Sequence, residues 1–290
     1  MKKLGLLLLL LMCQNALSQG QPKFLKLKKY RVAYLSDSLR ETSGLTLLGG
    51  KLYTFNDGGN TSDIFKIDKK SGKILTKIKT GFQNTDWEAM TTDGRMLYIG
   101  DFGNNAGSRQ DLNIKIFRLD QDASDNAADI HFKYPEQNDF TTQLLNTDFD
   151  AEGMVYINGQ LHIFTKEWKT KGVSHYILDP RLENQSATKT EAYQTNFFVT
   201  DTAYFDSKLF VVGYTRKTEV YLNIFSETEG GKFFRSAPQI FYLGSALKVG
   251  QIEGIAVDEA GIYISGEAFR TPLGNARQSF YFIPKNKLVE

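Results

Sequence analysis

Acidic residues recur along the chain in one repeated phrase. Residues 86–90 read DWEAM, residues 150–154 read DAEGM and residues 251–255 read QIEGI. Each copy carries a Glu two residues after an Asp or a Gln, and a short apolar stretch follows it at the same offset. Carboxylates that repeat in this way can hold a hard cation or share protons, provided that the fold brings the copies together.

Two weaker copies, at residues 41–45 and 200–204, complete a column of five. Each repeat contains short runs of β-forming residues, four in a complete repeat, separated by turns rich in Gly and Asn. A period of about 40–50 residues with four strands per repeat is typical of a β-propeller. The aligned column is Ser43, Glu88, Glu152, Thr202 and Glu253, at spacings of 45, 64, 50 and 51 residues.

These repeats predict an all-β fold, a five-bladed β-propeller with four-stranded blades. The long spacing of 64 residues leaves a six-bladed ring as the alternative. The last repeat is one strand short, and residues 24–35 form a strand-like run outside every repeat. We predict that this run is one strand that joins the C-terminal blade and closes the ring, which leaves no open sheet edge. A single propeller domain then spans residues 24–290.

The N-terminus has the pattern of an export signal. Two lysines, the apolar run 6–12 and a small-residue site at 16–18 predict a signal peptide over residues 1–18. The apolar run is too short to cross a bilayer as a helix. We expect an exported protein, periplasmic or secreted, without a transmembrane segment. A lipoprotein anchored through Cys13 is the alternative.

Composition and charge exclude some functions. The chain of 290 residues is 41% apolar, enough for a sizeable core, and its one Cys leaves with the signal. Cleavage also removes two lysines, which leaves 33 basic residues against 33 acidic ones. A neutral chain without a basic stripe has no long-range field for nucleic acid. We expect a monomer.

The repeated acids should meet at one mouth of the propeller channel. The first strand of each blade lines the axis, and the loops after the second strands return to the same face. Crowded carboxylates must be protonated or bind a cation, and Ca²⁺ accepts roughly six to eight oxygen ligands. Three Glu with Ser43 and Thr202 suit such an ion. A purely structural ring, in which each Glu accepts backbone N–H bonds, is the alternative. The loops add further acids: Asp57, Asp101, Glu167 and Glu267.

The same mouth could support catalysis. In a metal-dependent phosphoester or phosphoanhydride hydrolase, Asp86 or Glu88 would orient or deprotonate water. Arg109 or Arg270 would then hold the phosphates of a small anionic ligand. Glycoside hydrolysis by two carboxylates is a third possibility, with a glycan as the partner. We expect binding or scaffolding at the cell envelope rather than catalysis.

Two family resemblances follow from these motifs. Residues 41–45 (ETSGL) and 86–90, with the later Glu-Gly-Met and Glu-Gly-Ile phrases, resemble the SdiA-regulated and phytase-like β-propeller superfamily. That resemblance implies an exported propeller. The chain is also similar to five-bladed calcium-activated nucleotidases of the apyrase type. This similarity implies a Ca²⁺ ion on the axis, with a ligand set of Ser43, Glu88, Glu152 and Glu253.

Overall fold

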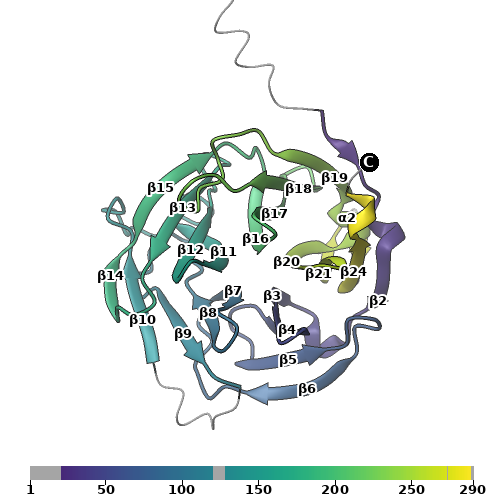
Figure 1. Ribbon diagram of the computed structural model, residues 1–290, viewed down its shortest axis with the longest axis horizontal. Coiled ribbons are helices and arrows are strands. Elements are labelled where there is room, and N and C mark those ends of the chain that lie inside the picture. Colours follow the sequence, from purple (N-terminus) through teal and green to yellow (C-terminus); the bar gives the residue numbers. More distant parts are fainter. Residues whose placement is uncertain (1–20, 120–127, 273, 289–290) are drawn as a thin grey trace, which may run out of the picture.

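Five sheets stand like blades around a central axis in the computed structural model (Figure 1). The structure describes residues 21–119, 128–272 and 274–288. The predicted signal peptide at residues 1–18 and Cys13 lie outside the described residues. Strands β3, β7, β11, β16 and β20 lie nearest the axis, and each begins a new blade (Figure 1). The five-bladed prediction is confirmed.

The first three blades follow one another along the chain. Blade 1 consists of β3 (Thr42–Leu48), β4 (Lys51–Asn56), β5 (Asp63–Ile67) and β6 (Ile74–Lys79). Blade 2 consists of β7 (Trp87–Thr92), β8 (Leu97–Asp101), β9 (Asn113–Phe117) and β10 (Ala128–Lys133). Blade 3 consists of β11 (Asp150–Ile157), β12 (Gln160–Lys166), β13 (Val173–Leu178) and β15 (Thr188–Tyr193). A short strand from blade 3, β14 (Asn184–Ser186), pairs in parallel with β10.

The last two blades include the N-terminal strands. Blade 4 consists of β16 (Phe198–Phe205), β17 (Lys208–Tyr214), β18 (Glu219–Ser226), β19 (Gln239–Ser245) and β1 (Lys23–Phe24). Blade 5 consists of β20 (Gln251–Asp258), β21 (Gly261–Glu267), β24 (Ser279–Pro284) and β2 (Arg31–Tyr34). The smaller elements are α2 (Ala246–Val249), the hairpin β22 (Phe269–Thr271) and β23 (Gly274–Ala276), and three 3₁₀ turns, η1 (Leu27–Tyr30), η2 (Asp37–Leu39) and η4 (Lys285–Lys287).

Closure of the ring by the N-terminal segment is confirmed, because β2 pairs antiparallel with β24 at the outer edge of blade 5. The prediction of one strand over residues 24–35 is wrong. The segment first adds β1 to blade 4, then turns through η1 and only then forms β2. The reason is packing: Leu25 and Leu27 are buried in a core cluster shared by blades 4 and 5, so the chain must bend inward between them.

The long spacing between the second and third repeats is a loop. Residues 135–149 contain no strand, and β14 enters the sheet of blade 2 instead of forming a further blade. Among the described residues, no helix is long and apolar enough to cross a membrane.

Packing between blades uses one aromatic position on each second strand. Its residues pair with equivalent positions on the inner strands and are almost fully buried. Burial of an apolar side chain such as Phe210 at this position contributes about 1.5–3 kcal/mol. The residues at this position are Tyr53, Tyr98, His162, Phe210 and Tyr263.

Each inner strand carries a β-bulge near its start, which interrupts the ladder and re-aims one side chain. The extra residue lies between Trp87 and Ala89 in β7, between Ala151 and Gly153 in β11, and between Ile252 and Gly254 in β20. Glu88, Glu152 and Glu253 are therefore the bulge residues of three blades. In β16 the bulge residue is Thr200, so the alignment of Thr202 with the three Glu is wrong by two residues.

Candidate functional site

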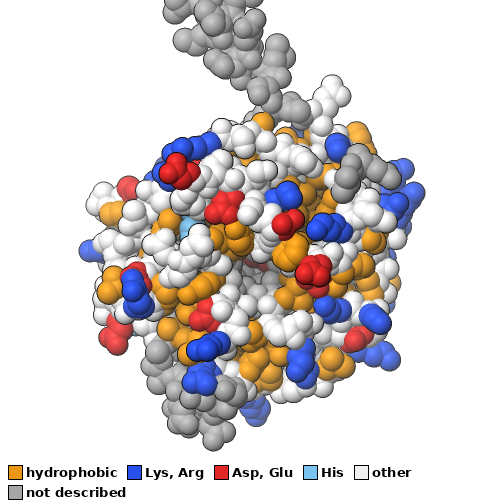
Figure 2. Space-filling view, viewed as in Figure 1, with side chains coloured by type: hydrophobic (Ala, Val, Ile, Leu, Met, Phe, Trp, Pro, Cys, Tyr) orange, Lys and Arg blue, Asp and Glu red, His pale blue; other side chains and the backbone are white. Residues whose placement is uncertain are grey.

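The starts of the inner strands and the ends of the second strands meet at one mouth of the channel. Trp87 pairs with Asp101, Asp150 with Lys166, and Gln251 with Glu267. The predicted return of these loops to the face that carries the bulge residues is confirmed. Viewed along the axis, the propeller is hollowed at its centre, and acidic and basic side chains are scattered over the face that the view shows (Figure 2).

Three carboxylates from blades 1 and 2 converge at this mouth. Asp57 follows β4, Asp86 precedes β7, and Glu88 is the bulge residue of β7. One oxygen of each lies within 4.8 Å of the others. Glu88 is only 8% exposed, whereas the other two are half-buried. We call Asp57, Asp86 and Glu88 the acidic triad; it joins both predicted catalytic acids to a loop acid.

Two glycines make room for the triad. A Cβ atom added to Gly58 would collide with the Asp86 carboxylate. A Cβ atom on Gly103 would collide with the same group and lie 2.5 Å from Oε1 of Glu88. Any side chain at either position would displace these carboxylates. The two glycines therefore let the backbone pack directly against Asp86 and Glu88.

Amide side chains and backbone groups hold the triad loops in place. Asn60 and Asn84 each donate a side-chain hydrogen bond to the carbonyl oxygen of Asp57, at 2.9 and 3.1 Å. The Asp101 carboxylate accepts a bond of 3.1 Å from the backbone N–H of Asp86. These contacts fix the backbone of the triad loops. In addition, Asp57 Oδ1 accepts a hydrogen bond from the backbone N–H of Gly58.

Burial and mutual repulsion make the triad costly to ionise. Burial, with the charges of Asp57 and Asp150, raises the pKa of Asp86 to about 7. Burial, followed by the charge of Asp57, raises the pKa of Glu88 well above its usual range. Within the described residues, no hydrogen bond or ion pair reaches the side-chain oxygens of Asp86 or Glu88. Among the described residues, no cation contacts these two carboxylates, and the charge of nearby Arg109 only partly offsets the rise in the pKa of Asp86.

Glu152 stands at the same bulge position as Glu88 but has a cation of its own. Lys166 Nζ lies 2.7 Å from Glu152 Oε1, and both side chains are buried. The ammonium also lies 4.8 Å from the centre of the Trp168 ring. Burial would lower the pKa of Lys166, but Glu152 and the neighbouring acids raise it well above its usual value, so it stays charged. Lys166 is thus not a free cation on the rim.

Glu253 has a neutral partner. Gln251 Nε2 donates to Glu253 Oε1 at 2.6 Å. Burial, only partly offset by Lys166 and Gln251, raises the pKa of Glu253 to about 7. Burial and the charge of Glu253 raise the pKa of Glu267 to about 9.

The hydroxyls of the ring contact the backbone of the next blade. Ser43 Oγ donates to the carbonyl oxygen of Glu88 at 3.1 Å, and Thr200 Oγ1 donates to that of Ile252 at 2.6 Å. That Ser43, Glu152 and Glu253 bind a metal with Glu88 stays a prediction. The group of acids in the described residues that can share one ion is the triad.

The two predicted arginines differ in their surroundings. Arg109 donates to the carboxylates of Asp101 and Asp111, each at 3.0 Å, and to the Gly103 carbonyl oxygen at 3.0 Å. All three of its nitrogens are therefore engaged, and it stabilises the loop beside the triad. Arg270 lies exposed on the β22–β23 hairpin.

The tryptophans do not form an exposed platform for a sugar. Trp87 is fully buried and packs edge-on against Phe55. Trp168 is half-buried; it packs against Phe198 and donates to Asp150 Oδ2 at 2.7 Å. Nothing in these contacts favours the glycoside hydrolase alternative.

Comparisons with known proteins give no family for this chain. No family model matches it, and no curated protein matches it. Among solved structures it is similar to the β-propeller domain of Cps50 (Swd1) from Myceliophteria thermophila. The identity is 11%, over 84% of this chain and 96% of that chain, with a TM-score of 0.40. A likeness at this level says nothing about function, and membership of the SdiA-regulated and phytase-like superfamily stays a prediction.

Proposed function

We propose that this protein is an exported β-propeller that binds a divalent cation, Ca²⁺ in preference, at the acidic triad. Its role is then ligand binding or scaffolding at the cell envelope. The observation that carries the proposal is the convergence of three carboxylates, within 4.8 Å of one another, with no ion pair to a described cation. Carboxylates left in this state favour either protons or a hard cation.

The chemistry of the donors suits calcium. Carboxylate oxygens are the ligands that Ca²⁺ prefers, and backbone carbonyls and water can complete its shell. Gly103 lets the backbone approach the carboxylates of Asp86 and Glu88 together, which keeps the two groups close to each other. Zinc is disfavoured because the triad offers neither a thiolate nor an imidazole.

A binding role fits the site better than hydrolysis. The guanidinium of Arg109, which a phosphohydrolase would need for its substrate, is occupied by two carboxylates and a carbonyl oxygen. The proposal therefore expects calcium binding without turnover of phosphate esters.

Calorimetric titration of the mature chain with CaCl₂, after treatment with chelator, tests the proposal. We expect one site, lost in Asp86→Asn and Glu88→Gln. Gly103→Ala should also lose it, because the added methyl group displaces the carboxylates of Asp86 and Glu88 without changing the charge. Asp206→Asn, an exposed acid distant from the triad, is the matched control and should bind normally. No calcium binding by the folded wild type would refute the proposal.

Two further measurements address the role and the location. Calcium-activated cleavage of a nucleotide, of phytate or of a phosphodiester, abolished in Asp86→Asn, would establish the hydrolase alternative instead. Expression of the full chain in a bacterial host, followed by N-terminal sequencing, should give an exported protein that begins at Gln19. Retention of the uncleaved chain inside the cell would contradict export.

A further inference from the structure

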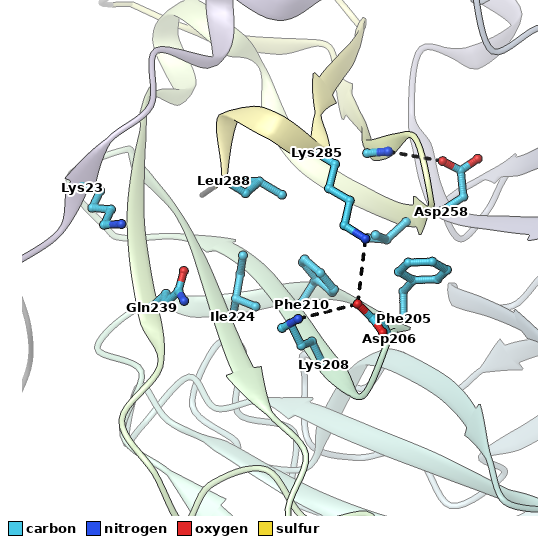
Figure 3. Close-up of a pocket in the computed structure, with 12 residues that line it drawn as sticks. Lys23, Phe205, Asp206, Lys208, Phe210, Ile224, Gln239, Asp258, Lys285 and Leu288 are labelled. Atoms are coloured by element: carbon cyan, nitrogen blue, oxygen red, sulfur yellow. Dashed lines mark hydrogen bonds and ion pairs between the residues drawn. The ribbon is translucent and has the colours of Figure 1, made fainter. Parts of the chain in front are cut away.

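A cavity lies between blades 4 and 5 (Figure 3). Its volume is about 240 Å³. Strands β16 and β20 begin at the acidic mouth and run to the opposite face, where their last residues, Phe205 and Asp258, line the cavity. This cavity, which we call the blade 4–5 pocket, is therefore separate from the triad.

The floor of the blade 4–5 pocket is apolar. Phe205, Phe210 and Ile224 come from blade 4, and Val257 comes from blade 5. Leu288, which follows β24, closes one side (Figure 3). An apolar floor of this kind favours the hydrocarbon part of a ligand, because its burial releases water from both surfaces.

Ammonium groups are in excess at the rim of the pocket. Lys208 Nζ and Lys285 Nζ lie 3.8 and 3.9 Å from the same atom, Asp206 Oδ2 (Figure 3). Both distances exceed that of a hydrogen bond, so one carboxylate attracts two ammonium groups without binding either closely. Lys23 lines the far side (Figure 3). The other acid, Asp258, already pairs with Lys69 at 3.0 Å.

The turn that carries Asp206 is unusual among the hairpin turns of this propeller. Asp206 and Ser207 both have positive φ, 52° and 53°. Gly49–Gly50 occupy the corresponding turn of blade 1, and Asn158–Gly159 that of blade 3. A non-glycine pair in this conformation costs backbone energy. The turn places the Asp206 carboxylate between Lys208 and Lys285, so its negative charge holds both ammonium groups at the rim of the pocket.

We infer that the blade 4–5 pocket binds a small amphipathic carboxylate. The carboxylate head would lie between Lys208 and Lys285, where charge-assisted hydrogen bonds replace their long contacts with Asp206. A short alkyl chain or a single ring would lie on the floor formed by Phe205, Phe210 and Ile224. The pocket is smaller than the roughly 300–1,000 Å³ of sites for drug-sized ligands, so the ligand is small.

The choice of probes separates the two halves of the inference. Benzoate supplies both the ring and the carboxylate, acetate supplies the charge alone, and benzyl alcohol supplies the ring alone. We expect ligand-observed NMR titrations of the mature chain to show saturable binding of benzoate, with acetate and benzyl alcohol at least about tenfold weaker. Equal binding of either partial probe, or no saturable binding of benzoate to the folded protein, would overturn the inference.

Variants at the rim give changes of opposite sign. Lys208→Gln with Lys285→Gln should weaken benzoate binding about tenfold or more. Asp206→Asn should tighten it severalfold, because it removes the competing carboxylate while Asn still tolerates a positive φ. Lys51→Gln is the matched control, since Lys51 begins β4 as Lys208 begins β17, and it should change nothing. Unchanged binding in the double lysine variant would overturn the inference. Chelator should not affect benzoate binding, so this test is independent of the calcium proposal.

Discussion

Glu88 in blade 2 and Glu152 in blade 3 occupy the same position in two adjacent blades, yet their surroundings are opposite. Each is the bulge residue of an inner strand, and each is almost fully buried. Glu152 forms an ion pair with Lys166, whereas Glu88 faces Asp57 and Asp86 and has no ion pair with a cation in the described part of the chain. One carboxylate is neutralised by the fold, and the other needs a proton or an external ion.

The difference lies in the second strand rather than in the repeated phrase. Asp57, Phe102 and Lys166 stand at the same distance after the core aromatic position of their blades. In blade 3 this residue supplies the counter-charge, and in blade 1 it adds a further negative charge. Repetition of the Glu therefore builds a ring, but the residue at the end of the second strand decides what each Glu does.

Removal of Lys166 should have the largest effect on this comparison. Lys166→Met leaves Glu152 buried without its partner, which costs about 3–5 kcal/mol of unfolding free energy. Urea denaturation in chelator measures the loss. Lys169→Met, an exposed lysine on the same loop, is the control and should change stability by less than about 0.5 kcal/mol. A loss below about 1 kcal/mol in Lys166→Met would mean that Glu152 is neutralised by other means.

The pH dependence of stability tests a buried basic group, His162, in addition to the two buried glutamates. His162 is buried, and its Nδ1 lies 2.8 Å from Nε2 of His175. Burial and His175 lower the pKa of His162 from 6.5 to about 4. The unfolded chain therefore binds more protons than the folded chain between these pH values. The stability contributed by neutral His162 is complete above pH 6.5 and is lost as the pH falls toward 4.

The loss from His162 should reach up to about 3 kcal/mol, and the acids with raised pKa values oppose it over part of the range. We therefore expect His162→Phe to be less sensitive to acid than the wild type between pH 6.5 and 4, measured by urea denaturation. His131→Gln, which replaces an exposed histidine, should follow the wild type. Identical acid sensitivity of His162→Phe and the wild type would contradict the assignment.

Neutral replacement of the two glutamates should change stability in opposite directions. Glu152→Gln removes the partner of buried Lys166 and should lower stability by about 2 kcal/mol. Glu88→Gln removes an uncompensated carboxylate and should raise stability by about 1 kcal/mol above neutral pH in chelator. Chemical denaturation of both variants under one set of conditions measures the difference. The same sign for both would remove the distinction between the two blades.

The sequence predicted the ring better than the partners of its acids. The repeated phrases gave five blades and placed Glu88, Glu152 and Glu253 at one mouth, since strand order alone brings such positions together. The Glu152–Lys166 pair could not be derived in the same way. The turn at Asn158–Gly159 fixes which residues of β11 and β12 face each other next to it. The bulge at Glu152 shifts this pairing by one residue, so the partners beyond the bulge cannot be counted from the turn. A Gly follows both Glu152 and Glu253, as is common at a bulge, but a Gly within a strand does not by itself fix the residue at which the ladder is interrupted.

The other wrong predictions also concern features that depend on packing in the folded chain. The partial alternation of residues 24–35 predicts a strand, but burial of Leu25 and Leu27 between two blades bends the chain there. The Thr200–Thr202 error came from two threonines two residues apart, either of which can align with a Glu. Asp57 was visible as an acid near the mouth, but its approach to Asp86 depends on Gly58, which only the folded backbone reveals.

Anomalous diffraction from crystals soaked in a heavier calcium analogue such as Tb³⁺, with a Ca²⁺ competition control, tests the central claim most directly. We predict one strong peak that Ca²⁺ displaces, about 2.3–2.6 Å from oxygens of Asp57, Asp86 and Glu88. A displaceable peak on the axis between Glu88, Glu152 and Glu253, or no peak at the mouth at saturating ion, would contradict the claim that the uncompensated acids of blades 1 and 2 form the cation site.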